Sequence, residues 1–517
     1  MALPSFHEFG SQSLDKLLGI KVPALAAGRD PFRQLRYIQD YVEYLECSAL
    51  IVESDYIDRD YIEDHSIFYS RNREFLPNCC IRLHFFHGIN AADLERRFDE
   101  IADAAKSPPP PGKDRAAISV EFSESHYLGF MVVKPLPGCP VGRTVLRTYP
   151  RESKNGTLRE FRGSLRYEVH LLGVCISVLG LAFQQQDEGV SACATTAIWS
   201  SLQKVKSTEE VSAATPAQIT TLASRFTMPF GRSMPSEGLS LDQMCQSIHA
   251  LALSPDLLRT PKYEVARGVV YAASLSHTAP ILIIAHHTGA RHAVTVAGVK
   301  RVPDHAVTPL GLSLDDRAGD LRGLYIHDDR IGPYVSAKLQ PLGDRLRKAW
   351  AKYPDINPAA PQLTITAGNG TEEWLVTHVL TPIHAKVRLS FNQIRLFAYD
   401  VAAMLDQAVI FKGLPAKRIG FGVRILRAHL YAQKLLSDPN TSTSRRKSFF
   451  ERISMSRYVG LIRLNANKVG AFDVLVDTTG TPRNARCLGF IYRDQPNAMG
   501  EEIGQALADH YECPFVS

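Results

Sequence analysis

The chain has 517 residues, which at about 150 residues per domain corresponds to roughly three domains. Hydrophobic residues make up 45% and charged residues 22%, and these ordinary proportions exclude a mainly disordered chain, a collagen-like fibre and a coiled-coil rod. A net charge of +6 is small for this length and does not indicate a dedicated nucleic-acid binder, which usually carries a concentrated basic surface.

The cysteines and the apolar segments indicate the compartment. The nine cysteines are scattered and form no C-x-x-C pair, which favours buried thiols in a reducing environment. The N-terminus lacks the basic start and apolar core of a secretory signal. The longest apolar stretch, residues 169–183, is too short to span a bilayer and is typical of two consecutive buried strands. We therefore expect a soluble cytoplasmic protein without a membrane anchor.

Residues 1–165 have the pattern of an N-terminal α/β domain. Helical and strand-like runs alternate here, and a run of four prolines cannot continue either element, because proline fixes φ and lacks an N–H donor. The predicted elements are a helix over 30–44, strands over 47–54 and 78–88, a helix over 91–105, an exposed loop over 107–113 and a hairpin over 117–137.

Residues 166–345 and 346–517 form the second and third predicted domains. The middle one starts with strands, continues with a helix that begins near Cys193, and ends with strands over 281–286, 292–299 and 323–329. The C-terminal α+β domain has predicted helices over 391–405 and 423–436, a mobile polar linker over 437–448, and strands over 458–464, 471–477 and 486–492.

The segment around Cys193 is the strongest local signal for chemistry. Small and polar residues precede the cysteine, and a helical pattern begins at Ala194, so Cys193 lies where a loop enters a helix. The N–H groups and the dipole at a helix N-terminus favour a thiolate, the form in which cysteine acts as a nucleophile. The alternative is a small residue that is simply buried at a helix start.

Two later segments supply polar side chains at strand ends. His292 opens a strand after a turn that contains Gly289, and His286 and His287 end the strand before that turn. No cysteine or carboxylate stands at a recognised zinc-ligand spacing from these histidines, so we predict no metal and no cofactor. Asp328 ends the strand over 323–328, although an aspartate in this position can also serve only to cap a turn.

The order of these residues resembles the papain-like cysteine peptidases, and more narrowly the branch that contains the bacteriocin-leader peptidases of bacterial transporters. In that branch a Q-x(5–7)-C segment supplies an oxyanion-hole glutamine and the nucleophile, H-A-V-x-V-x-G supplies the base, and an aspartate ends the next strand. The matching positions are Gln186, Cys193, His292 in HAVTVAG and Asp328, with Gln184 and Gln185 as alternatives for the glutamine. The match covers about 170 residues, and its helical insert matches residues 238–255. Ala194 and Asp329 stand where the branch usually has glycine and proline.

The resemblance implies an α+β fold in which a papain-like core, a cysteine-bearing helix on an antiparallel sheet, is flanked by two α/β or α+β domains. It also implies a thiol hydrolase, most simply a peptidase acting on a protein or peptide through an acyl-enzyme. His292 would take the proton of Cys193, Asp328 would fix the imidazole, and Gln186 would stabilise the oxyanion. The same triad serves deamidases, isopeptidases and acyltransferases, and the core could also be a non-catalytic scaffold that binds a partner.

Two charged segments suggest other functions. Residues 53–64 hold six acidic side chains in twelve, which indicates a solvated loop, a docking surface for a basic partner protein, or a flap over the cleft. Residues 444–458 mix five basic side chains, starting at Arg445, with Phe449 and Phe450, a pattern that can bind single-stranded nucleic acid. We favour a surface helix or strand entry for the latter and do not expect nucleic-acid binding. Trp199 could lie beneath the active site or belong to the core.

Overall fold

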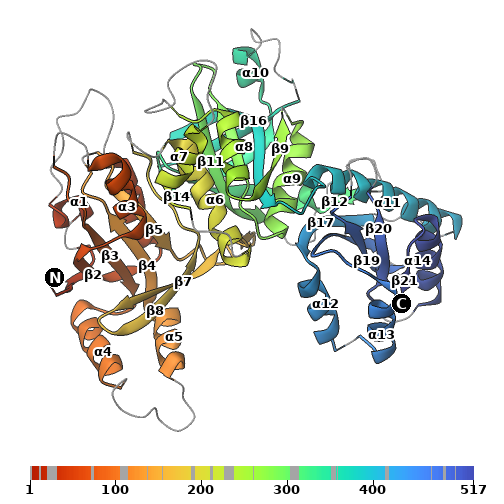
Figure 1. The fold of residues 1–517 in the computed structure, drawn as a ribbon, viewed down its shortest axis with the longest axis horizontal. Coiled ribbons are helices and arrows are strands. Elements are labelled where there is room, and N and C mark those ends of the chain that lie inside the picture. Colours follow the sequence, from red (N-terminus) through yellow and green to blue (C-terminus); the bar gives the residue numbers. More distant parts are fainter. Residues whose placement is uncertain are drawn as a thin grey trace.

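The computed structural model describes the chain from residue 3 to residue 517 with gaps at 11–12, 20–31, 71–74, 105–114, 137, 154, 188–191, 210–213, 226–237, 260, 303–313, 351–356, 358, 369, 414–418, 440, 467–468, 481–484 and 495–496. The fold is α+β, with one mainly antiparallel sheet in each of three lobes (Figure 1). The proline-rich loop predicted over 107–113 lies outside the described residues.

The N-terminal lobe is a five-stranded antiparallel sheet with helices on both faces. Its strands, in spatial order, are β1 (Ser5–Glu8), β2 (Cys47–Tyr56), β3 (Cys80–His87), β4 (Tyr127–Val133) and β5 (Val141–Leu146). Its helices are α1 (Leu14–Leu17), α2 (Arg33–Tyr44), α3 (Arg59–Asp64), a π-helical turn (His65–Tyr69), α4 (Ala91–Ala104) and α5 (Arg115–His126). Side chains alternate along β2, so that Leu50 packs in the cluster around α2, and Ala49 and Ile51 in the cluster that contains α4.

The hairpin predicted over 117–137 is wrong, because the first half of this segment is helix α5. Only one side of α5 meets the core, where Phe122 packs against Phe86 and Phe98 with ring centroids 6.2 and 5.7 Å apart. Ser123 Oγ donates to the Ser119 carbonyl one turn earlier, a helical contact. Tertiary packing therefore overrides the strand-like alternation of the sequence.

The central lobe contains a closed six-stranded barrel. The ring runs through β10 (Ile281–Ala285), β11 (Arg291–Arg301), β13 (Leu321–Asp328), β14 (Gly332–Pro341), β15 (Pro361–Ala367) and β16 (Gly370–His384), and β16 pairs again with β10. Strand β9 (Leu253–Arg259) extends β16 and β6 (Leu158–Glu160) pairs with β11. The helices of this lobe are α6 (Cys193–Glu209), α7 (Pro216–Ser224), α8 (Leu241–Ala250), α9 (Tyr263–Leu275), α10 (Asp344–Trp350) and a 3-10 turn (Arg317–Asp320).

The C-terminal lobe is a six-stranded sheet between two helix layers. The strands, in spatial order, are β12 (Leu314–Asp316), β17 (Ile419–Arg427), β18 (Tyr458–Ala466), β19 (Gly470–Asp477), β20 (Cys487–Tyr492) and β21 (Phe515–Val516). The clusters of buried side chains place α11 (Phe391–Phe411) and α14 (Ala498–His510) on one face, and α12 (Ala428–Ser437) and α13 (Thr443–Arg452) on the other (Figure 1).

Two predictions for this lobe are wrong. The helix predicted over 423–436 begins as strand, because Val423 and Ile425 alternate into the core as part of β17 before α12 begins. The mobile linker predicted over 437–448 contains the start of α13. There the Ser442 side chain accepts a hydrogen bond from the Arg445 backbone N–H at 3.1 Å and caps the helix.

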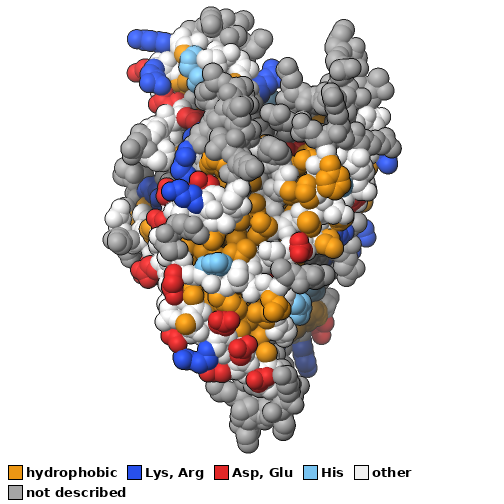
Figure 2. Space-filling model, turned by 90° about the vertical axis from the view of Figure 1, so that its left-hand side faces the viewer, with side chains coloured by type: hydrophobic (Ala, Val, Ile, Leu, Met, Phe, Trp, Pro, Cys, Tyr) orange, Lys and Arg blue, Asp and Glu red, His pale blue; other side chains and the backbone are white. Residues whose placement is uncertain are grey.

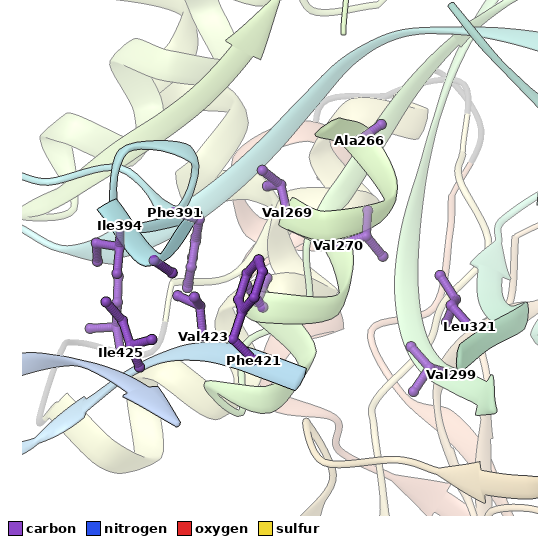
Figure 3. Packing of buried hydrophobic residues seen from close by; sticks show 14 of the residues in the cluster. Ala266, Val269, Val270, Val299, Leu321, Phe391, Ile394, Phe421, Val423 and Ile425 are labelled. Atoms are coloured by element: carbon purple, nitrogen blue, oxygen red, sulfur yellow. The ribbon is translucent and has the colours of Figure 1, made fainter. Parts of the chain in front are cut away.

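The sheets do not divide the chain at 165 and 345 as predicted. The hairpin of β7 (Leu165–Leu171) and β8 (Val174–Gly180) lies against the N-terminal lobe, where Phe183 bridges to Thr144 in β5. Beyond 345, β15 and β16 complete the barrel. The barrel and the C-terminal sheet also share one core, in which side chains of α9 lie beside those of α11 and β17 (Figure 3). None of the helices in the described residues is long and apolar enough to cross a membrane.

Candidate active site

Helix α6 brings Cys193 to the wall of the barrel. The cysteine is the first helical residue, as predicted, and its side chain is half-buried. Small residues such as Ala194 and Ala197 on the buried side let the helix approach β11 closely, and Thr295 Oγ in β11 donates to the Ala197 carbonyl at 2.9 Å. The helix start is thereby fixed against the strand that carries His292.

His292 lies near the start of β11, where it pairs with Ile284 of β10. Its side chain is buried, and the nearby Cys193 thiol is one of the groups that favour the charged form of its imidazole. Ring atom Nε2 lies 3.0 Å from Asp328 Oδ1, which leaves Nδ1 as the ring nitrogen for the sulfur. The structure therefore brings the three residues of the predicted triad, Cys193, His292 and Asp328, close together.

Asp328 ends β13, and Arg330 surrounds its carboxylate with donors. The Arg330 backbone N–H and Nε lie 3.0 and 3.1 Å from Oδ1, and its terminal NH2 lies 2.8 Å from Oδ2. Burial alone would raise the pKa of Asp328, but the charges of His292 and Arg330 outweigh it and hold the pKa below the usual range of a carboxyl group. Asp328 is therefore a fixed anion.

A second carboxylate, Asp329, faces the same nitrogen. Its Oδ1 lies 3.3 Å from His292 Nε2, the side chain is 4% exposed, and neither oxygen has a hydrogen-bond partner. Burial, with the adjacent charge of Asp328, raises the pKa of Asp329 to about 6. For His292, burial would lower the pKa, but the charges of Asp328 and Asp329 prevail and raise it to about 10. The imidazolium therefore persists at neutral pH.

Trp374 and Glu372, both in β16, form a rim over this acid pair. The centroid of the Trp374 ring lies 6.1 Å from that of His292. The Arg330 guanidinium stacks over the Trp374 ring, 4.9 Å from its centroid. Arg330 also lies 3.1 Å from a Glu372 carboxylate oxygen, which accepts from Trp374 Nε1 at the same distance. Apolar and cationic cover thus shields the contact between His292 and Asp328 from water.

The three glutamines before Cys193 have different environments. Gln185 Oε1 accepts from the Val141 N–H at 3.2 Å and its Nε2 donates to Gly138 at 3.3 Å, so this side chain joins two chain segments. Gln184 Nε2 is buried without a hydrogen-bond partner, whereas Gln186, the predicted oxyanion donor, is half-buried. Residues 188–191, which connect them to Cys193, lie outside the described part.

Metal ligation is the other chemistry that this donor set allows. One ligand atom from each of His292, Asp328 and Asp329 lies within 4.8 Å of the others, as a divalent cation would require. However, both oxygens of Asp328 already accept from Arg330, so a metal would have to displace a guanidinium. Of the other two predicted histidines, His286 packs on Trp374 with ring centroids 5.2 Å apart, and His287 is exposed. The arrangement fits acid–base chemistry better than metal binding.

The acidic segment 53–64, for which a solvated loop, a docking surface and a flap were the alternatives, turns several of its acidic side chains into the protein. Asp58, Asp60 and Asp64 are buried, and Asp58 lies 2.6 Å from Arg143, while the Asp64 side chain accepts from the backbone N–H of Ala217 in α7. Asp60 accepts from Trp199 Nε1 at 3.1 Å, which places this tryptophan in the core. The face of the molecule that lies on the left in Figure 1 shows hydrophobic side chains with Asp and Glu scattered among them (Figure 2). The segment therefore ties the N-terminal lobe to α6 and α7.

The basic segment 444–458 also turns part of its pattern inward. Arg445 is 7% exposed and donates to the Asp494 carbonyl at 3.3 Å, and Phe449 is completely buried under α13. Only Phe450 of the two aromatic residues is exposed. The alternation of basic and aromatic residues therefore reflects a helix that packs on a sheet.

Comparison with known proteins leaves the site to be judged on its geometry. No family model matches the chain, and no curated protein matches it.

Proposed function

We propose that the protein is a cysteine hydrolase of the papain-like type, acting on a protein or peptide with Cys193 as nucleophile. The observation that supports this most is the convergence of three elements: the start of α6, the start of β11 and the end of β13 place a thiol, an imidazole and a buried carboxylate in one chain of contacts. A triad requires the thiol beside the imidazole, and Cys193 is near enough to His292 to favour its charged form. Packing of α6 on β11 does not by itself require a cysteine at this position.

In this proposal the Cys193 thiolate attacks the carbonyl carbon of the substrate and forms an acyl-enzyme. His292, held protonated by its two carboxylates, donates a proton to the departing amine and then takes one from the incoming water. Asp328 fixes the ring orientation. The Cys193 backbone N–H and the side-chain amide of Gln184 or Gln186 stabilise the oxyanion, each donor contributing about 3 kcal/mol.

Labelling with a peptide-based acyl electrophile tests the proposal. We expect the wild type to be modified at Cys193 and the Cys193→Ala variant to lose both modification and turnover. Cys245→Ser, which removes a half-buried thiol from α8, is the matched control and should label as the wild type does. Turnover that persists in Cys193→Ala would contradict the proposal.

The acceptor of the acyl group decides between hydrolysis and transfer. Digestion of a denatured peptide library by the wild type should produce new N-termini if the enzyme is a peptidase. Release of ammonia with intact peptides would identify a deamidase, and new amide bonds to added amines would identify an acyltransferase. If wild type and Cys193→Ala give identical product patterns, the core is a non-catalytic scaffold.

A further inference from the structure

A pair of cysteines lies at the far end of the C-terminal lobe. Cys487 is the first residue of β20, and Cys513 lies two residues before β21. These two strands are parallel neighbours, with Phe490 opposite Phe515, and the Phe490 N–H donates to the Pro514 carbonyl at 2.9 Å. The pairing thus brings together two cysteines that are 26 residues apart in the chain.

Both cysteines are free thiols, and their sulfur atoms are 3.1 Å apart in hydrogen-bond contact. A disulfide has an S–S length of about 2 Å, so the sulfurs need to approach by only about 1 Å, within reach of a small side-chain rotation. The backbone at Cys513 is also fixed, because its N–H donates to the Ala508 carbonyl near the end of α14.

The two thiols differ in access and in acidity. Cys487 is 5% exposed, and Cys513 is half-buried. The hydrogen bond between the two thiols, together with burial, raises the pKa of Cys487, and the same hydrogen bond lowers the pKa of Cys513 against the effect of burial. Cys513 is therefore the thiol that ionises and meets a reagent first, with Cys487 behind it.

We propose that Cys487 and Cys513 form a reversible disulfide by exchange with a small disulfide of the glutathione class. The Cys513 thiolate attacks one sulfur of the small disulfide, whose other sulfur leaves as a thiolate, and a mixed disulfide forms. Cys487 then loses its proton to solvent, and its sulfur attacks the Cys513 sulfur and expels the second small thiolate. The protein pair loses two electrons and two protons, and the small disulfide is reduced to two thiols.

The bond would fasten the last strand of the chain. The loop closed by Cys487 and Cys513 carries α14, and Phe515 packs so closely on this helix that a Cβ at Gly504 would overlap its ring. Oxidation would therefore lock α14 and β21 onto β20 without moving either, since the reduced protein already holds the sulfurs in contact. This site lies outside the triad and does not depend on the proposed hydrolase.

Peptide mapping of the full-length protein tests the inference. The protein is equilibrated across a series of ratios of reduced to oxidised glutathione, its remaining thiols are blocked, and it is digested without reduction. We expect a cross-linked peptide that joins Cys487 and Cys513 and lacks two hydrogen atoms, reversed by reduced glutathione. The Cys245→Ser control should behave identically. Absence of this peptide at the most oxidising ratio, or pairing with other cysteines, would overturn the proposal.

Single substitutions test the order of attack, and circular dichroism verifies that each variant is folded. Cys487→Ser should accumulate the mixed disulfide on Cys513, because no second thiol resolves it. Cys513→Ser should leave Cys487 largely unmodified while the protein is native, because that thiol is buried. Faster capture of Cys487 than of Cys513 would contradict the assigned roles.

Discussion

Replacement of Asp328 by asparagine tests how the site keeps His292 charged. Asparagine preserves the shape of the side chain but removes its negative charge. In the wild type, burial lowers the pKa of the imidazolium, yet Asp328 and Asp329 raise it from 6.5 to about 10, which corresponds to roughly 5 kcal/mol of net stabilisation of the charged ring.

The neighbouring His327 provides a reference inside the same protein. It is 4% exposed, nearly the same as His292 at 5%, and burial lowers its pKa to about 3. Compared with that value of about 3, the pKa of His292 at about 10 shows that the two carboxylates more than reverse the effect of burial. If the two carboxylates share this effect equally, loss of one brings the pKa of His292 near its ordinary value of 6.5.

We therefore expect the His292 pKa to lie below 7 in Asp328→Asn. Nuclear magnetic resonance of the protein with 15N-labelled histidine, titrated from pH 5 to pH 10, measures it directly, with His292→Gln used to assign the signal. Asp242→Asn, which neutralises an exposed carboxylate at the start of α8, is the charge control and should leave the titration unchanged. A His292 pKa that stays above 9 in folded Asp328→Asn would refute the reasoning.

Three further predictions concern stability. Because the folded pKa of His292 is raised, its contribution to the free energy of unfolding is complete below about pH 6.5 and is lost as the pH rises through about 10, which urea titrations at several pH values measure. Gln185→Ala should cost roughly 1–3 kcal/mol of unfolding free energy and leave Cys193 labelling intact, because its amide joins two backbone segments. Gly268→Ala should lower the melting temperature, although alanine favours helices. The added Cβ would overlap the buried guanidinium of Arg395, which is paired with Asp316 at 2.5 Å. An unchanged melting temperature would contradict this.

Much of the fold could be predicted from local pattern. The strand of His292 is apolar on both sides because it faces α6 outside the barrel and the core inside. Its short length, its valines and the glycine turn before it favour a strand. The apolar stretch 169–183 predicted two consecutive buried strands, and the structure has the hairpin of β7 and β8 over 165–180, with buried and more exposed side chains alternating along both strands. Segments with a weaker pattern were not predictable, because contacts such as Phe122 with Phe86 decide between helix and strand only after the chain has folded.

The candidate site could be predicted in part. Cys193, His292 and Asp328 each stand at an element boundary that the sequence marks. Their order along the chain, which resembles that of the papain-like peptidases, singled them out as a candidate triad. Asp329 and Trp374 were missed for different reasons. The doubled aspartate was visible in the sequence, but only the folded turn after β13 shows that Asp329 reaches the same nitrogen as Asp328. Trp374 comes from β16, and only closure of the barrel places it near His292.

Acylation of Cys193 by a p-nitrophenyl ester tests the central claim most directly. Peptide mapping of the quenched reaction locates the acyl group, and a stopped-flow trace follows the release of nitrophenolate. The account predicts a burst of about one nitrophenolate per protein with the acyl group on Cys193, and loss of the burst in folded His292→Ala. An acyl group on other cysteines only, or a burst that survives in His292→Ala, would contradict it.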